Sequence, residues 1–97
     1  MGINYNKEYF FTYHPLVLKT DIPKLDTVMR DRIKISLEKK LVISPSIYGI
    51  PLHGVLNNYR KFRVGNYRVI FIIIKNEIRI LAIGHRSGIY EIIGRRI

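Results

Sequence analysis

Basic side chains gather in the segment 59–68, which reads Tyr-Arg-Lys-Phe-Arg-Val-Gly-Asn-Tyr-Arg. Cationic and apolar residues alternate on both sides of the Gly-Asn pair. This pattern predicts two β-strands joined by a two-residue hairpin turn at Gly65 and Asn66. In such a hairpin Arg63 faces Arg68, and Lys61 lies on the same face as Arg63. Because like charges opposite one another destabilise a strand ladder, we expect the arrangement to bind an anion.

A second group of candidate residues, Gly84-His85-Arg86, follows a later apolar segment. If this segment pairs antiparallel with the strand that begins at Tyr67, its end returns beside Arg68. A two-residue turn between the two strands predicts His85 on the Arg68 face, whereas a three-residue turn predicts Arg86 there. Tyr90 follows closely and could stack on a base or bind a phosphate.

These residue types favour phosphate chemistry. Fixed cations stabilise the negative charge that develops at a phosphorus atom during nucleophilic attack. Since we find no paired carboxylates and no metal-ligand motif, we expect a ribonuclease that needs no metal or other cofactor. In it, the ribose 2′-oxygen attacks the adjacent phosphate. The general base could be Lys61, which is crowded by arginines, or His85, because histidine is the usual choice for this role near neutral pH. A structural hydrogen-bonding role for His85 is about as well supported.

The composition also favours a polyanionic partner. Seventeen Lys and Arg against seven Asp and Glu give a formal net charge of +10 in 97 residues. Nucleic acid, an acidic protein or a membrane surface would all fit, and nucleic acid is favoured. The longest apolar run, 69–74, is too short to cross a bilayer, and the N-terminus does not resemble a signal peptide. The absence of cysteine fits a reducing compartment, so we expect a single cytoplasmic domain, 1–97, that does not associate with membranes.

The elements that must position these residues can be predicted in outline. Aromatic residues in 5–13 predict a first strand, and 14–21 could form a short helix. Asp21 is a candidate N-cap and Pro23 suits the first turn of a longer helix. That helix carries one apolar stripe, which we expect to be core: Leu25, Val28, Met29, Ile33, Leu37 and Leu41. Its polar face is more simply explained as a solvated surface than as an RNA contact.

The remaining segments predict an antiparallel meander of strands at 59–64, 67–75 and 78–84, followed by a short helix or tail at 88–97. The run 69–74 is apolar on both faces, as is typical of a central strand. The predicted fold is therefore α+β. An N-terminal strand and one or two helices pack on one face of a mainly antiparallel sheet of about four strands, and the cations lie at the rim of the other face.

Several ordered segments resemble the RelE family of toxins from bacterial and archaeal toxin–antitoxin pairs. They are Pro51-Leu52-His53-Gly54, the run from Tyr59 to Phe71, Gly84-His85-Arg86 and Tyr90, together with 14–18 and 21–25. The resemblance implies a compact toxin that cuts mRNA in the ribosomal A site. Such a metal-independent endoribonuclease, or mRNA interferase, would be neutralised by an acidic, RelB-like antitoxin.

The resemblance also implies residue roles. The two family cations of the second strand correspond to Lys61 and Arg63, although Arg63 stands where the family has lysine and an arginine rarely deprotonates. The expected catalytic residues are Lys61, Arg63, Arg68, His85, Arg86 and Tyr90. The expected RNA-binding residues are Arg60, Lys61, Arg63, Arg68 and Arg86.

Two other interpretations remain open. ParE-type toxins have a similar fold but inhibit DNA gyrase, and they are thought to lack the nuclease residues. The joint presence of these cations and Tyr90 therefore argues against a ParE-type function. The second alternative is a non-catalytic basic module that binds RNA or its antitoxin.

Overall fold

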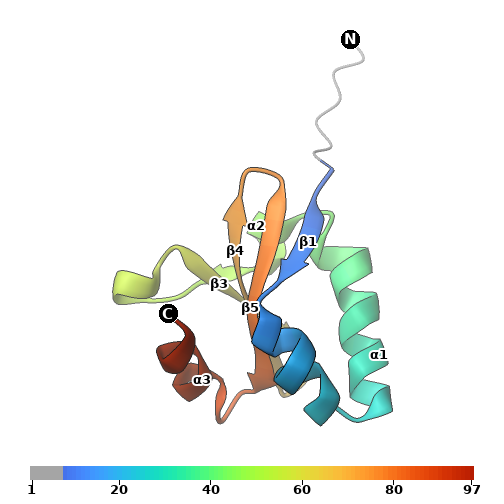
Figure 1. Ribbon diagram of the computed structural model, residues 1–97. Helices are drawn as coiled ribbons and strands as arrows, with labels where there is room; N and C mark the ends of the chain where they lie inside the picture. The colour runs from blue at the N-terminus through green and yellow to red at the C-terminus, as the bar shows by residue number, and fades with distance from the viewer. Residues whose placement is uncertain (1–7) are drawn as a thin grey trace.

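A five-stranded mixed sheet forms the centre of the computed structural model, which describes residues 8–97 (Figure 1). The strand order is β1-β5-β4-β3-β2. The strands are β1 (Phe10–Tyr13), β2 (Ile50–Pro51), β3 (Tyr59–Val64), β4 (Tyr67–Ile74) and β5 (Glu77–His85). The predicted meander is confirmed, while the short β2 adds a fifth strand. The first strand begins at Phe10, and the predicted part at 5–7 lies outside the described residues. It pairs parallel with β5, so only this edge departs from the antiparallel pattern.

The predicted hairpin between β3 and β4 is confirmed. Val64 pairs with Tyr67 and Arg63 pairs with Arg68, which leaves Gly65 and Asn66 as the turn. Gly65 has a φ of 59°. A positive φ at the first central residue is what a type II′ turn requires, and glycine adopts it without a steric penalty. The local sequence therefore sets the register that brings the two arginines together.

The next hairpin contains a β-bulge that the sequence did not reveal. Ile74 pairs with Glu77, so the turn has two residues, yet the register shifts between Phe71, which pairs with Ile80, and Ile70, which pairs with Ala82. Leu81 is the extra residue in β5. Because side chains alternate along a strand, one inserted residue exchanges the two faces beyond it. The expectation that a two-residue turn brings His85 to the Arg68 face is therefore wrong.

The helical layer covers one face of the sheet. Helical backbone runs through 15–24, including η1 (Val17–Asp21) and η2 (Ile22–Lys24). After a break come α1 (Thr27–Ser36) and η3 (Leu37–Leu41). The N-cap of α1 is Asp26, whose Oδ1 accepts a hydrogen bond from the Met29 amide at 2.7 Å. The predicted N-cap, Asp21, instead lies between two helical turns and is buried.

Most of the predicted helical stripe contributes to the core beneath this layer. Ile33, Leu37 and Leu41 are buried, and Leu25 and Met29 pack against them. Val28 is 78% exposed, so its assignment to the core is wrong. The sheet residues on this face are Phe62, Val64, Val69, Phe71, Ile78, Ile80 and Ile83.

The C-terminal segment forms a helix, α3 (Ile89–Arg96), that packs on the opposite face of the sheet. Figure 1 shows α1 and α3 on opposite sides of β5. Ile89 and Ile93 from α3 bury Ile70 and Ala82 of the sheet. Helices therefore cover both faces, whereas the sequence predicted helices on one face, cations at the rim of the other, and a short helix or tail at 88–97 without a place on the sheet. Among residues 8–97, every helix is too short or too polar to cross a bilayer.

The connection to β3 contains the one-turn helix α2 (Pro45–Tyr48) and the short turn η4 (Gly54–Leu56). Gly49, directly after α2, lies against the buried ring of Phe71. A Cβ at this position would be 2.3 Å from Phe71 Cζ and 2.9 Å from the Pro45 carbonyl oxygen. The close approach of the Phe71 ring and the Pro45 carbonyl group to this position therefore requires glycine.

Substitution of Gly49 tests this packing. We expect Gly49→Ala to lower the free energy of unfolding by about 1–3 kcal/mol, because the buried ring and backbone must move. The matched control is Gly94→Ala in α3, where the added Cβ would meet nothing within 4 Å beyond its two neighbours in the chain and the backbone of its own helix. This change should raise stability by about 0.5–1 kcal/mol through helix propensity. Urea unfolding measures both, and an unchanged midpoint for Gly49→Ala would contradict the packing.

Candidate functional site

Three cations of the β3–β4 hairpin lie on the face of the sheet that α3 covers in part. Lys61 pairs with Ile70, whose side chain is buried beneath α3. Arg63 and Arg68 form the next pair on the same face. Arg63 is exposed, whereas Lys61 and Arg68 are half-buried. The predicted cluster of cations is thus present in the structure.

Arg68 is held in place at the turn. Its Nη1 donates hydrogen bonds to the carbonyl oxygens of Gly65 at 3.0 Å and Tyr67 at 2.9 Å. Among residues 8–97, no hydrogen bond involves its Nε or Nη2. Anchoring by one nitrogen leaves the rest of the guanidinium free for an anion, which is the geometry needed for bidentate phosphate binding.

The first turn of α3 brings Tyr90 to this cluster. Its hydroxyl oxygen lies 3.4 Å from Lys61 Nζ, a long hydrogen bond, and the residue is 51% exposed. The ring is therefore available to a ligand above the sheet while its hydroxyl contacts the lysine. Residues 29 positions apart in sequence meet here because α3 packs back over β3 and β4.

The β-bulge determines which residue follows on the cation face. Arg68 pairs with Gly84, so His85 does not lie on the Arg68 face, and Arg86 follows β5 as the first residue of a turn. The Arg86 amide donates to the Asn66 carbonyl oxygen at 2.8 Å, which ties this segment to the β3–β4 turn. Arg86 thus lies next to the hairpin that carries Arg63 and Arg68.

His85 is directed to the other face. It pairs with Tyr67, and the two rings meet edge to face with centroids 5.4 Å apart. Its Nδ1 lies 2.9 Å from the Ser87 hydroxyl and accepts from the Ser87 amide at 3.2 Å. These contacts organise the turn that precedes α3. The structure therefore separates His85 from Lys61 and Arg68, and the structural interpretation of this histidine matches its contacts.

Arg60 also points away from the cluster. Its Nη1 donates to the carbonyl oxygens of Gly49 at 2.9 Å and Ser46 at 3.4 Å, so it holds the α2 connection against the sheet. A further cation, Arg32 of α1, which the sequence analysis did not select, reaches the turn of the hairpin from the opposite face of the sheet. A Cβ on Gly65 would lie 2.9 Å from Arg32 Nη1, which places this guanidinium at the hairpin turn.

The basic cluster has no internal counter-charge. Within residues 8–97, no carboxylate lies within 4 Å of the charged groups of Lys61, Arg63, Arg68 or Arg86; the ion pairs there are Arg79–Glu77, Arg95–Glu91 and Arg96–Asp21. Uncompensated like charges repel one another and add nothing to folding. The positive charge of the cluster is therefore available to an anionic ligand.

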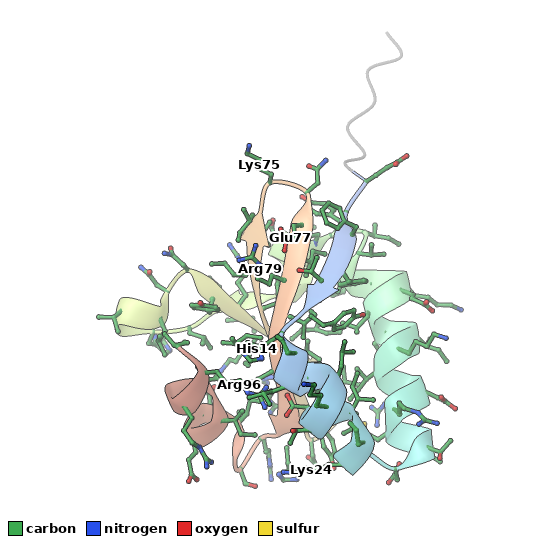
Figure 2. All side chains as sticks on the ribbon, viewed as in Figure 1. His14, Lys24, Lys75, Glu77, Arg79 and Arg96 are labelled. Carbon is green, nitrogen blue, oxygen red and sulfur yellow. The ribbon has the colours of Figure 1, made fainter. Side chains whose placement is uncertain are left out.

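Farther along the same face, beyond the cluster, the carboxylate of Glu77 pairs with Arg79. Arg79 Nε donates to Glu77 Oε2 at 2.9 Å, and the Thr12 hydroxyl also donates to that carboxylate. The hydrogen bond from Arg79, followed by that from Thr12, holds the pKa of Glu77 below its usual value. The same pair raises the pKa of Arg79. Figure 2 shows Glu77 and Arg79 close together on β5.

An apolar groove of about 350 Å³ lies on the opposite side, between the helical segment 15–24 and α1. Apolar side chains line most of it: Phe11, Leu18, Ile22, Leu25, Ile33, Leu37 and Ile83. Arg30 and Lys34 lie at its border, and burial, with a smaller effect of Glu38, raises the pKa of Tyr13 within it. Its composition suits an amphipathic segment with acidic side chains.

The hydrogen bonds from Arg79 and Thr12 to Glu77 predict that part of the folding stability is lost at acidic pH. Because the folded-state pKa is lowered, the stabilisation is present above the unfolded value of about 4.3 and is lost as pH falls through the folded pKa. We expect Arg79→Met to raise the Glu77 pKa and to move this part of the acid transition to higher pH. Carboxyl NMR titration and melting temperature against pH measure both effects. Arg95→Met, which removes an exposed pair with Glu91, should leave Glu77 unchanged; an unmoved Glu77 titration in Arg79→Met would refute the assignment.

Comparison with known proteins identifies the family. A family model described as the ParE toxin of the type II toxin–antitoxin system, parDE, matches residues 18–90, while no curated protein sequence gives a significant match. The RelBE2 toxin–antitoxin complex from Mycobacterium tuberculosis superposes with a TM-score of 0.74 at 23% identity, covering 81% of this chain and 99% of that chain.

Two further structures extend this comparison. The isolated RelE toxin from E. coli gives a TM-score of 0.67 at 26% identity and covers 91% of this chain and 97% of its own. The RelB–RelE complex from Methanococcus jannaschii gives 0.63 at 23% identity, with 81% and 94% covered. Since the family model spans most of the chain and the fold matches RelE toxins throughout, the chain belongs to the ParE toxin family of type II toxin–antitoxin systems, within the RelE/ParE superfamily.

Proposed function

We propose that this toxin is a ribosome-dependent endoribonuclease that cleaves mRNA in the ribosomal A site. The observation that carries the proposal is the unpaired cation cluster. Lys61, Arg63 and Arg68 share one sheet face, and the Tyr90 hydroxyl meets Lys61 there at 3.4 Å. A gyrase inhibitor has no need of this combination, whereas phosphoryl transfer does.

The reaction would proceed by internal attack. The ribose 2′-oxygen attacks the adjacent phosphorus, the bond from phosphorus to the 5′-oxygen breaks, and the products are a 2′,3′-cyclic phosphate and a 5′-hydroxyl. Charge builds on the phosphate oxygens in the transition state, where Arg68, Arg63 and Arg86 would stabilise it. The fixed position of Arg68 supports this role, because a pre-oriented donor loses little reorganisation energy during reaction.

Proton transfer would fall to groups beside the cluster. Lys61 and the Tyr90 hydroxyl lie on the correct face and contact each other, so either can act on a ribose or phosphate oxygen bound there. His85 lies on the other face with Tyr67 and Ser87 as partners. This placement favours Lys61 over His85 as the general base.

An acidic antitoxin is the expected regulator. Related structures are complexes of RelE with RelB, and this chain carries a formal charge of +10 that a stable partner must offset. The apolar groove bordered by Arg30 and Lys34 and the cationic face offer it two kinds of contact. Neutralisation would follow from masking Arg63 and Arg68 against the ribosome and mRNA.

The second candidate function is inhibition of DNA gyrase. The match of residues 18–90 to the ParE model supports it, since toxins named for that family were the alternative raised by the sequence. The two activities differ in what they destroy. A nuclease depletes mRNA without damaging DNA, whereas a gyrase inhibitor leads to DNA breaks while mRNA remains intact.

The deciding test maps cleavage on stalled ribosomes. Purified protein is added to ribosomes on a defined message, 5′ ends are located by primer extension, and free RNA and a gyrase supercoiling assay run in parallel. We expect cuts in the A-site codon, and Arg68→Ala should slow them on the order of 10²- to 10³-fold because one transition-state donor is lost. Arg95→Ala, an exposed arginine of α3, serves as the matched control. Supercoiling inhibition without RNA cuts from folded protein would replace the proposal with the gyrase function.

The register of β5 yields a second test of the same site. Arg86→Ala should reduce ribosome-dependent cleavage strongly, because the Arg86 amide is bonded to the Asn66 carbonyl oxygen at the turn next to Arg68. By contrast, His85→Ala should retain most of the rate and mainly loosen the turn before α3. Single-turnover cleavage and thermal melting separate the two effects. A large loss of rate in a stable His85→Ala protein would mean that this histidine takes part in catalysis, and would contradict the structural role inferred from the β-bulge.

A further inference from the structure

A buried ion pair joins the helical segment 15–24 to α3. Arg96, in the last turn of α3, donates from Nη1 to Asp21 Oδ2 at 2.6 Å and from Nη2 to Asp21 Oδ1 at 2.7 Å. The side chains are only 7% and 2% exposed. In Figure 2, Arg96 lies between α3 and the helical segment 15–24. The contact is bidentate, which fixes the orientation of both groups.

The pair also completes the hydrogen bonding of the free edge of β5. The parallel ladder with β1 ends where Tyr13 pairs with Ile80 and the His14 amide bonds to the Ile80 carbonyl. Beyond that point the Leu81 carbonyl accepts from Arg96 Nη1 at 3.0 Å, and the Ile83 amide donates to Asp21 Oδ2 at 2.9 Å. Two side chains therefore replace the missing strand at the bulge, where unpaired backbone groups would be costly.

This arrangement fixes α3 against the strand. Gly84 lies directly beneath the helix, since a Cβ there would be 3.3 Å from the terminal methyl groups of both Ile89 and Ile92. The apolar contacts press α3 onto the sheet but have little directional preference. By contrast, four hydrogen bonds from one ion pair specify where the end of the helix must be.

The opposite end of α3 carries Tyr90. Six residues separate it from Arg96, which corresponds to about 9 Å along a helix, a distance over which a helix behaves as a rigid body. Fixing Arg96 therefore also fixes the position of Tyr90 above Lys61. A buried ion pair contributes little net stability compared with apolar packing, so its directional role is the better explanation for its presence.

We propose that Asp21 and Arg96 are positioning residues: their pair docks α3 on the free edge of β5 and so holds the Tyr90 hydroxyl beside Lys61. The catalytic consequence rests on the proposed nuclease function, whereas the docking itself does not. Neither residue touches the cation cluster, and both act through the helix.

Three variants probe this role. Arg96→Lys keeps the charge but cannot form the bidentate contact. The double variant Asp21→Asn with Arg96→Gln removes both charges, so no unpaired charge is left buried and the protein keeps its best chance of folding. Arg95→Gln is the control, because this neighbouring arginine forms only an exposed pair with Glu91.

Amide hydrogen exchange and NMR of the Tyr90 ring measure docking without any need for activity. We expect faster exchange in α3 and at Ile83, a shift of the Tyr90 ring signals, and unchanged protection in the centre of β4. Unaltered exchange in α3 in the folded Arg96→Lys and double variants would overturn the proposal. So would uniform loss of protection across the sheet in both, since that result would assign the pair to global stability alone.

Cleavage kinetics test the connection to Tyr90. Displacement of a reacting group by about 1 Å can slow a reaction on the order of 10²-fold, and we expect a loss approaching this size in Arg96→Lys. When Tyr90 is already replaced by Ala, the Arg96 substitution should cause little further loss, because both changes remove the same contribution. Fully multiplicative losses would exclude action through Tyr90. If the wild-type protein cuts no RNA, the nuclease proposal fails, while exchange and the Tyr90 signals still decide whether the pair positions the helix.

Discussion

The extra residue in β5, Leu81, decides how this fold presents its charged groups. Without it, alternation would continue through the strand and turn His85 toward Arg68. With it, the faces exchange, Arg68 pairs with Gly84, and His85 meets Tyr67 instead. The extra residue also has a carbonyl oxygen at the edge of the strand, and Arg96 donates a hydrogen bond to it. One inserted residue thus determines both the composition of the cation face and the attachment of the helix above it.

The two faces of the sheet differ in composition: one is packed with apolar side chains, and the other carries the cation cluster. On the face beneath α1, buried apolar side chains such as Phe71 and Ile80 supply the larger core. On the other face, α3 covers only part of the sheet, and Lys61, Arg63 and Arg68 remain beyond it or at its edge. Repulsion among these cations must be offset by the core, since no carboxylate among residues 8–97 pairs with them. A site that is costly in the free protein is well suited to bind a charged ligand strongly.

Membership in the RelE/ParE superfamily is compatible with more than one activity. The fold alone does not distinguish them, because function depends on side chains placed on a shared scaffold. The proposed nuclease function therefore rests on local features of this chain: a strand pair that holds Arg63 opposite Arg68, and a helix that brings Tyr90 to Lys61. The buried pair of Asp21 with Arg96 shows that the position of this helix is specified by directional contacts as well as by apolar packing.

The amino-acid sequence by itself determined the elements that depend on neighbours along the chain. Period-two alternation and the Gly65-Asn66 pair specified the hairpin and its register, and the apolar spacing of Ile33, Leu37 and Leu41 specified a helix with one buried face. These are local effects of backbone geometry and side-chain periodicity, which a short segment carries in full. The resemblance to RelE toxins rested in part on the hairpin, within the run from Tyr59 to Phe71.

Only the tertiary structure decided the features that depend on distant partners. The bulge at Leu81 depends on the pairing of β5 with β4 and on the hydrogen bond from Arg96 of α3 to the Leu81 carbonyl oxygen. The local pattern of β5 therefore does not predict it. Asp21 has the sequence context of an N-cap, yet its carboxylate is buried against Arg96, 75 positions away. Val28 fits the helical stripe but finds no surface to cover it. Burial and pairing are properties of the assembled layers, and for that reason the cation face could be predicted while its exact membership could not.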